Sequence, residues 1–270
     1  MTARPLDPRR LEPGSDDVPA AEARGEPPLL PDRWQAESAL VHERMEKMYR
    51  PQRRIYDLTR KWYLSGRDRL LDSIAAPPGA RILEIGCGTG RNLVRLGRRL
   101  PGVLLCGVEP ARSMLETAEK ALARAGLAGR ARLAYATAES LDAHRQLGTD
   151  RFEHVVLSYC LSIVSEPLPA LDRALALLAP DGTLHLVDFG PMGGLPGWAR
   201  AAMRAWLARF GVRHRPEVAV ELRRRAARGE GRLEAETIGR GYAELFRFAR
   251  PGAATARGHG VAWTAPRAPC

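Results

Sequence analysis

Apolar residues in the middle of the chain gather in short runs, and longer stretches with helical spacing separate these runs. The runs cover residues 81–85, 103–108, 131–135, 154–158 and 183–187. Apolar runs that alternate with amphipathic segments are typical of parallel strands connected by helices. The pattern therefore predicts an α/β protein with a doubly wound, Rossmann-like sheet.

The pattern changes after the fifth run. Residues 195–228 have helical spacing, and the stretch RLEAETIGRGYAELFRFA reads as two strands joined by a tight Gly-Arg-Gly turn. This C-terminal antiparallel hairpin brings the predicted sheet to seven strands. Ahead of the first run, the chain has helical spacing and many Arg and Tyr residues, which predicts an N-terminal helical lid.

The composition divides the chain into four predicted segments. They are a disordered tail over 1–33, the helical lid over 34–78, a folded domain over 79–249 and a flexible tail over 250–270. The first tail is rich in Pro and charged residues, and the second is rich in Gly, Pro and Ala. Such sequences bury too little apolar surface to offset the entropy lost on ordering.

Three glycines follow the first predicted strand directly, in the stretch RILEIGCGTGRN. Gly86, Gly88 and Gly90 let the backbone take positive φ and approach a ligand at the carboxyl ends of the strands. The spacing is G-x-G-x-G, whereas a dinucleotide fingerprint needs a further glycine where this chain has Arg91. The loop therefore favours a ligand without a pyrophosphate.

A carboxylate ends the second predicted strand. Glu109 lies 23 residues after Gly86, and a carboxylate at this place can accept hydrogen bonds from both ribose hydroxyls of an adenosyl group. Glu84 lies inside the glycine motif itself. Together these residues make a simple turn a poor explanation of the motif.

The stretches LEIGCGTG and VEPARSML resemble the class I S-adenosylmethionine-dependent methyltransferases. The resemblance makes residues 79–249 a methyltransferase domain with S-adenosylmethionine as cofactor and no metal. It implies a methionine moiety over residues 86–90, a ribose on Glu109 and an adenine near Pro110 and Met114. The stretch ATAES has a threonine where relatives often have an Asp for the adenine amino group. The implied cofactor residues are Glu84, Gly86, Gly88, Gly90, Glu109, Pro110, Met114, Thr137 (through its hydroxyl), Ala138 (through its N–H) and Ser158.

The acceptor side lacks a catalytic triad in the sequence. The histidines are scattered, and His154 and His185 occupy strand positions where a structural role is expected. An amine acceptor needs no dedicated acid–base pair, because orientation and desolvation can supply much of the acceleration.

The stretches YRPQRRIYDLTRKWYLSGRDRLL, HVVLSYCLSIV and LHLVDFG resemble bacterial N-methyltransferases that convert diacylglyceryl-homoserine to a trimethylated betaine lipid. Phosphatidylethanolamine N-methyltransferases are similar more distantly. Because aromatic faces stabilise a quaternary ammonium product, we expect Tyr63 and Tyr159 to converge over the sulfonium methyl and Arg67 to bind the homoserine carboxylate. The alternative for the first stretch is a helix that only packs on the sheet. Gly211 departs from the pattern, because these relatives would have a histidine there.

Charge and composition bear on the partner. The formal net charge is +11, and residues 195–210 combine an apolar face with arginines, as interfacial helices do. The alternative is an ordinary core-facing helix. No segment has the apolar core of a signal peptide or a spanning helix. We therefore expect a cytoplasmic protein at the inner, anionic membrane face, supplied by an enzyme that makes the homoserine lipid.

The sequence leaves two other classes of function as alternatives. A nucleic-acid methyltransferase usually has an amide or aromatic motif after the fourth strand to hold a flipped base, but this chain has SYCLSIVSEP. A cofactor-binding module without catalysis would be expected to lose contacts of the kind that Glu109 makes. A small-molecule acceptor remains an alternative to the lipid, and no nucleic acid partner is expected.

Overall fold

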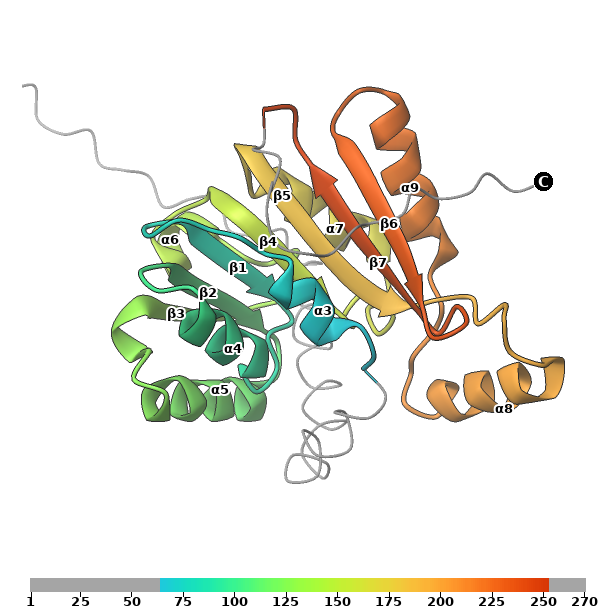
Figure 1. Ribbon diagram of the computed structural model, residues 1–270. Helices are drawn as coiled ribbons and strands as arrows, with labels where there is room; N and C mark the ends of the chain where they lie inside the picture. The colour runs from blue at the N-terminus through green and yellow to red at the C-terminus, as the bar shows by residue number, and fades with distance from the viewer. Residues whose placement is uncertain (1–63, 253–270) are drawn as a thin grey trace, which may run out of the picture.

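The computed structural model describes residues 64–252 of the chain. Its centre is a seven-stranded sheet in the order β3-β2-β1-β4-β5-β7-β6 (Figure 1). The strands are β1 (Arg81–Ile85), β2 (Leu104–Glu109), β3 (Ala131–Tyr135), β4 (Phe152–Ser158), β5 (Leu178–Phe189), β6 (Arg232–Ile238) and β7 (Ala243–Ala249). The first five run parallel, and β7 lies antiparallel between β5 and β6. The predicted fold class is confirmed.

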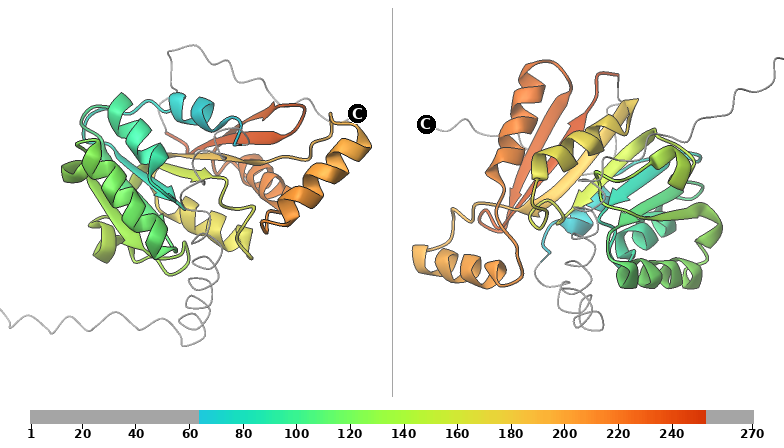
Figure 2. Two further views of the ribbon diagram at one scale, coloured as in Figure 1. Left: turned by 90° about the horizontal axis from the view of Figure 1, so that it is seen from below. Right: turned by 180° about the vertical axis from the view of Figure 1, so that it is seen from behind.

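Helices cover both faces of the sheet (Figures 1 and 2). One apolar cluster lies under α3 (Arg67–Asp72), α4 (Arg91–Arg99) and α5 (Arg112–Arg124). The other lies under α6 (Ala143–Leu147), α7 (Pro167–Ala176) and α9 (Pro216–Ala227). The 3-10 helix η1 (Ala128–Arg130) precedes β3, and α8 (Gly197–Ala208) extends outward after β5.

The two-sided cover explains why the central strands are apolar throughout. Successive residues of a strand point to opposite faces, so Ile82 packs in the cluster under α4 while Leu83 packs in the cluster under α7. β1 and β3 have the predicted bounds. β5 is longer than predicted, because its first part also pairs with Phe152 of β4 across a register shift.

The predicted Gly-Arg-Gly turn joins β6 to β7. Gly239, Arg240 and Gly241 have φ values of 61°, 58° and 86°, a left-handed conformation that glycine adopts without strain. β6 therefore runs parallel to β5, and both strands end at the same edge of the sheet as β1 and β2.

The predicted helical region over 195–228 contains two helices, α8 and α9. Gly211, with φ of 72°, and Val212 donate backbone hydrogen bonds to Ala208 and Leu207 and so end α8. Pro216 then begins α9. Gly211, which stands where the resemblance predicts a histidine, thus serves to end α8.

Of the predicted N-terminal lid, only α3 and its flanks lie within the described residues, and the predicted tail over 1–33 lies outside them. Most of the predicted tail over 250–270 is also outside. Within residues 64–252, no helix is long and apolar enough to cross a bilayer. Over the same residues, no group of three His, Cys, Asp or Glu side chains is placed to hold a metal ion.

Candidate functional site

The glycine loop connects β1 to α4, and each of its glycines meets a different constraint. Gly86, Gly88 and Gly90 all have positive φ, at 74°, 55° and 75°. A Cβ on Gly86 would lie 2.9 Å from Cys160, and one on Gly90 would lie 2.9 Å from Ala118. A Cβ on Gly88 would meet nothing within 4 Å. Two glycines therefore serve close packing, while the space over Gly88 is open to a ligand.

Glu109 lies beside this loop at the end of β2. Its Oε2 accepts the backbone N–H of Gly88 at 2.9 Å, and its Oε1 accepts that of Ala111 at 3.0 Å. The carboxylate is therefore held in one orientation by the backbone. Because a carboxylate oxygen can accept more than one hydrogen bond, ribose hydroxyls can also bind here. This arrangement fits the adenosyl group of S-adenosylmethionine.

Glu84 lies behind the loop and is almost fully buried. Its Oε1 accepts a hydrogen bond from Nδ2 of Asn92 at 2.6 Å, and its Oε2 has no partner among the described residues. Burial raises the pKa of Glu84 to about 8, against the opposing effects of Asn92 and the charge of Arg67. A cationic ligand group over the loop would favour the ionised carboxylate.

Arg67 is the first residue of α3 and is buried at the edge of this site. Its charge acts on the pKa values of both Glu84 in β1 and Tyr159 after β4, so it lies close to both residues. Arg91 of α4 fixes the same helix, because its Nη1 and Nη2 bind the Asp68 carboxylate at 2.7 and 3.1 Å. Arg91 stands where a dinucleotide-binding motif would have its third glycine, and here it holds α3 in place.

Tyr159 follows β4 and is buried. It has φ of 55°, which is uncommon for a residue with a large side chain. Its hydroxyl donates a hydrogen bond to the carbonyl of Ser65, and its ring packs edge-on against Phe189 with 4.8 Å between centroids. Tyr159 therefore joins the loop after β4 to the segment before α3. Tyr63, its predicted partner, lies outside the described residues.

The motif LHLVDFG contributes two residues for which the sequence indicated no role. The Asp188 carboxylate accepts the backbone N–H of Ser162 at 2.9 Å and that of Phe189 at 2.8 Å. Burial raises the pKa of Asp188 to about 6. The ring of Phe189 lies between Tyr159 and Tyr242, with 5.6 Å between the centroids of Phe189 and Tyr242. Asp188 thus anchors the loop that carries Tyr159.

The residues predicted to contact the adenine differ in their exposure and in their existing hydrogen bonds. Pro110 is partly exposed, but Met114 is fully buried and presents no surface in this arrangement. The hydroxyl of Thr137 already contacts Oγ of Ser140 at 3.0 Å and accepts its N–H at 3.1 Å. Two further predicted residues adjoin these elements: Ala138 is buried after β3, and the buried Oγ of Ser158 has no partner among the described residues.

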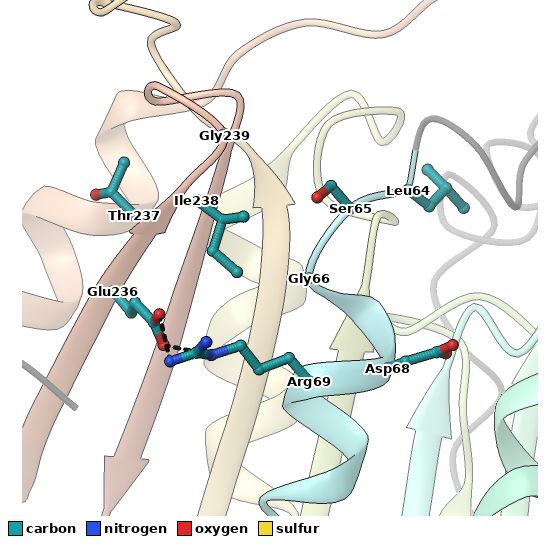
Figure 3. Close-up of a pocket in the computed structure, with 9 residues that line it drawn as sticks. All are labelled: Leu64, Ser65, Gly66, Asp68, Arg69, Glu236, Thr237, Ile238 and Gly239. Atoms are coloured by element: carbon teal, nitrogen blue, oxygen red, sulfur yellow. Dashed lines mark hydrogen bonds and ion pairs between the residues drawn. The ribbon is translucent and has the colours of Figure 1, made fainter. Parts of the chain in front are cut away.

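A separate pocket of about 560 Å³ opens between the start of α3 and the end of β6 (Figure 3). Arg69 reaches across it to Glu236, with Nε 3.0 Å from Oε2 and Nη2 2.7 Å from Oε1. Ser65, whose carbonyl binds Tyr159, also lines it. The pocket does not include the glycine loop or Glu109, so it is separate from the residues expected to bind the cofactor.

Residues 83–184 match the protein family described as Methyltransferase domain. The chain is 30% identical over 143 residues to the ubiquinone/menaquinone biosynthesis C-methyltransferase UbiE of Vibrio vulnificus, across 50% of this chain and 52% of the relative. It is 29% identical over 153 residues to the nocamycin O-methyltransferase of Saccharothrix syringae, across 56% of this chain and 52% of the relative. The chain thus spans about half the length of the curated relatives it matches.

Among solved structures, the fold resembles a Burkholderia thailandensis 1,6-didemethyltoxoflavin-N1-methyltransferase with bound S-adenosylhomocysteine. The TM-score is 0.55 at 19% identity, over 83% of this chain and 92% of that chain. The predicted class I methyltransferase fold is confirmed, and the family match over residues 83–184 supports S-adenosylmethionine as the cofactor. The three names describe C-, O- and N-methyltransferases, and none of the three describes a lipid headgroup as acceptor.

Proposed function

We propose that the protein is an S-adenosylmethionine-dependent N-methyltransferase that methylates a lipid headgroup amine, converting diacylglyceryl-homoserine to its trimethylated betaine lipid. The cofactor supplies a sulfonium methyl group that an unprotonated amine can attack directly. The observation that carries the proposal is the aromatic group at the carboxyl edge of the sheet, in which Tyr159 and Phe189 are buried and Tyr242 is partly exposed.

The aromatic group suits the charge that builds up on the acceptor. Each methyl transfer moves positive charge towards nitrogen, and a quaternary ammonium cannot donate a hydrogen bond, so aromatic faces are its best neutral partners. Tyr159 precedes Cys160, whose Cβ would lie 2.9 Å from a Cβ on Gly86. The aromatic group therefore begins beside the loop that would hold the methyl donor.

Arg67 supports a homoserine over an ethanolamine headgroup. A homoserine carries a carboxylate next to its amine, and a guanidinium can bind a carboxylate through two parallel hydrogen bonds. In this proposal, Arg67 binds the carboxylate while the aromatic group surrounds the amine. Phosphatidylethanolamine and small amines are the alternative acceptors. The protein would act at the cytoplasmic face of the membrane, after an enzyme that makes the homoserine lipid.

C-methylation of a quinone precursor is the second candidate, because the UbiE relative of Vibrio vulnificus is named for that chemistry. A phenolic ring must lose a proton as its carbon is methylated, so this reaction needs a base beside the ring. Of the described carboxylates at this edge, Glu84 and Glu109 belong to the cofactor loop, and Asp188 binds two backbone N–H groups and anchors the loop after β4. An amine also loses a proton before its second and its third methylation, but that proton can leave to water between transfers, so the amine acceptor makes the smaller demand on a positioned base.

The test compares acceptors directly. The purified protein receives S-adenosylmethionine with micelles that contain diacylglyceryl-homoserine, phosphatidylethanolamine or a demethylated quinol, and mass spectrometry resolves products by the number of methyl groups added. Products from the homoserine lipid, absent with Glu109→Ala, are expected. Products from the quinol alone would establish the second candidate. A protein that binds the cofactor but methylates none of the three would refute both.

A further inference from the structure

Helix α8 differs from the other long helices in how little of it is buried. Leu207 is its one buried residue, whereas α5 buries five. The side chain of Trp198 is 79% exposed, that of Trp206 is 40% exposed and that of Phe210 is 37% exposed. Most helices in proteins are stabilised by packing an apolar face, so this exposed aromatic surface is unusual.

Trp198 and Trp206 share one side of the helix, and Phe210 lies in the turn that follows it. At 100° per residue, Trp198 and Trp206 lie within a quarter turn of each other, and the ring of Phe210 contacts that of Trp206 with 5.1 Å between centroids. Leu207 and the partly buried Met203 face the protein instead. The apolar face predicted from the sequence therefore divides into an inner edge on the core and an outer aromatic edge.

Positive charge surrounds this edge. Residues 189–216 contain five arginines and neither Asp nor Glu. Arg209 and Arg213 are exposed at the end of α8, and Arg204 donates to the carbonyl of Pro191 at 2.9 Å. An exposed aromatic surface beside exposed cations matches the headgroup region of an anionic bilayer, where Trp rings and Arg side chains are both stabilised.

Helix α8 lies at the end of the molecule where the parallel strands have their carboxyl ends (Figures 1 and 2). β5 ends at Phe189, and α8 is the next element along the chain. Beyond α8, the N–H of Arg213 donates to the carbonyl of Ser162 at 2.9 Å, in the loop that Asp188 anchors. A bilayer seated on α8 would therefore face the strand ends where the cofactor loop and Tyr159 lie.

We propose that α8 is an interfacial anchor that binds an anionic lipid bilayer through Trp198, Trp206 and Phe210, with Arg209 and Arg213 on the headgroups. A second copy of the chain fits less well, because a twofold interface would set the same arginines against each other without a carboxylate. This docking surface is independent of the acceptor, since a membrane-bound enzyme can methylate a lipid or a quinol.

The test is flotation of the full chain with vesicles of phosphatidylcholine alone or mixed with phosphatidylglycerol. Wild type should bind the mixed vesicles, bind neutral ones at least tenfold more weakly, and lose binding as salt rises. The variant W198S/W206S should bind the mixed vesicles at least tenfold more weakly. Its control is Val220→Ser, which changes an exposed apolar residue on α9.

Two double variants that remove the same number of positive charges show whether binding depends on the arginines near α8 or only on the net charge of the protein. Arg209→Gln with Arg213→Gln should weaken vesicle binding about tenfold or more, whereas Arg223→Gln with Arg224→Gln on α9 should change it less than twofold. Equal losses in both pairs would refute α8 as the site. Unchanged binding by W198S/W206S, or a dimer that this variant converts to a monomer, would also overturn the proposal. Circular dichroism and the melting temperature show that each variant is folded.

Discussion

The backbone N–H of Gly88 donates a hydrogen bond to Oε2 of Glu109 at 2.9 Å. This contact makes the glycine loop after β1 and the carboxylate after β2 a single unit. The two residues are 21 positions apart in the chain, and the parallel register of β1 and β2 brings them together. The carboxylate thus both orients the loop and offers its oxygens to a ligand.

Replacement of Glu109 should weaken cofactor binding. Glu109→Ala removes charge-assisted hydrogen bonds that are each worth about 1.5–3 kcal/mol, so the affinity for S-adenosylmethionine should fall tenfold or more. Isothermal titration calorimetry measures the change. The control is Glu119→Ala, an exposed carboxylate on α5. Equal affinities of wild type and Glu109→Ala would remove the assignment of the ribose site.

Two glycine variants should separate packing from ligand binding. Gly90→Ala places a Cβ 2.9 Å from Cβ of Ala118 and 3.1 Å from its Cα, whereas Gly88→Ala meets nothing within 4 Å. Both pay about 1–2 kcal/mol for a left-handed backbone. Gly90→Ala should therefore lower the melting temperature more, while Gly88→Ala should act mainly on cofactor affinity. Equal melting temperatures would contradict these different roles.

The pair His154 and His185 should make stability depend on pH. Nδ1 of His154 lies 3.1 Å from Nε2 of His185, and burial lowers the pKa of His154 to about 4 and that of His185 well below 6.5. Because the unfolded chain binds protons that the folded chain excludes, this contribution is complete above pH ~6.5 and is lost as the pH falls towards 4.

The variant His154→Gln removes one of the two imidazoles that bind protons on unfolding. Its free energy of unfolding should be lower than that of wild type at pH 8, and the difference should shrink by ~1–3 kcal/mol at pH 5. Urea denaturation at both pH values measures it. His144→Gln, at an exposed position, serves as the control. A difference that stays constant between the two pH values would show that His154 does not titrate as stated.

Tyr159 should contribute to stability through its hydroxyl and to catalysis through its ring, and two variants separate these contributions. Tyr159→Phe keeps the ring against Phe189 but loses the hydrogen bond to Ser65, so the melting temperature should fall while the ratios of methylated products stay similar. Tyr159→Ala also loses the ring, so under the proposed function the later methylations should slow most. Cofactor affinity should change little in both. Wild-type product ratios in Tyr159→Ala would refute the aromatic role.

The sequence alone was sufficient for the strands, the hairpin turn and the cofactor loop. These features depend on local properties, namely the spacing of apolar residues and the freedom of glycine to take positive φ at positions such as Gly88 and Gly239. The carboxylate of Glu109 was also predictable, because in a doubly wound sheet the second strand lies beside the first, and its carboxyl end therefore adjoins the loop after the first.

Tertiary structure decided the contacts between segments that are distant in the chain. Asp188 binds the N–H of Ser162, 26 positions away, and Tyr159 binds Ser65, 94 positions away. Periodicity shows which side of an element is apolar, but not which partner covers it or whether any does. The outer edge of α8 is therefore known only from the packing, because Trp198 and Leu207 satisfy the same apolar pattern while one is exposed and the other buried.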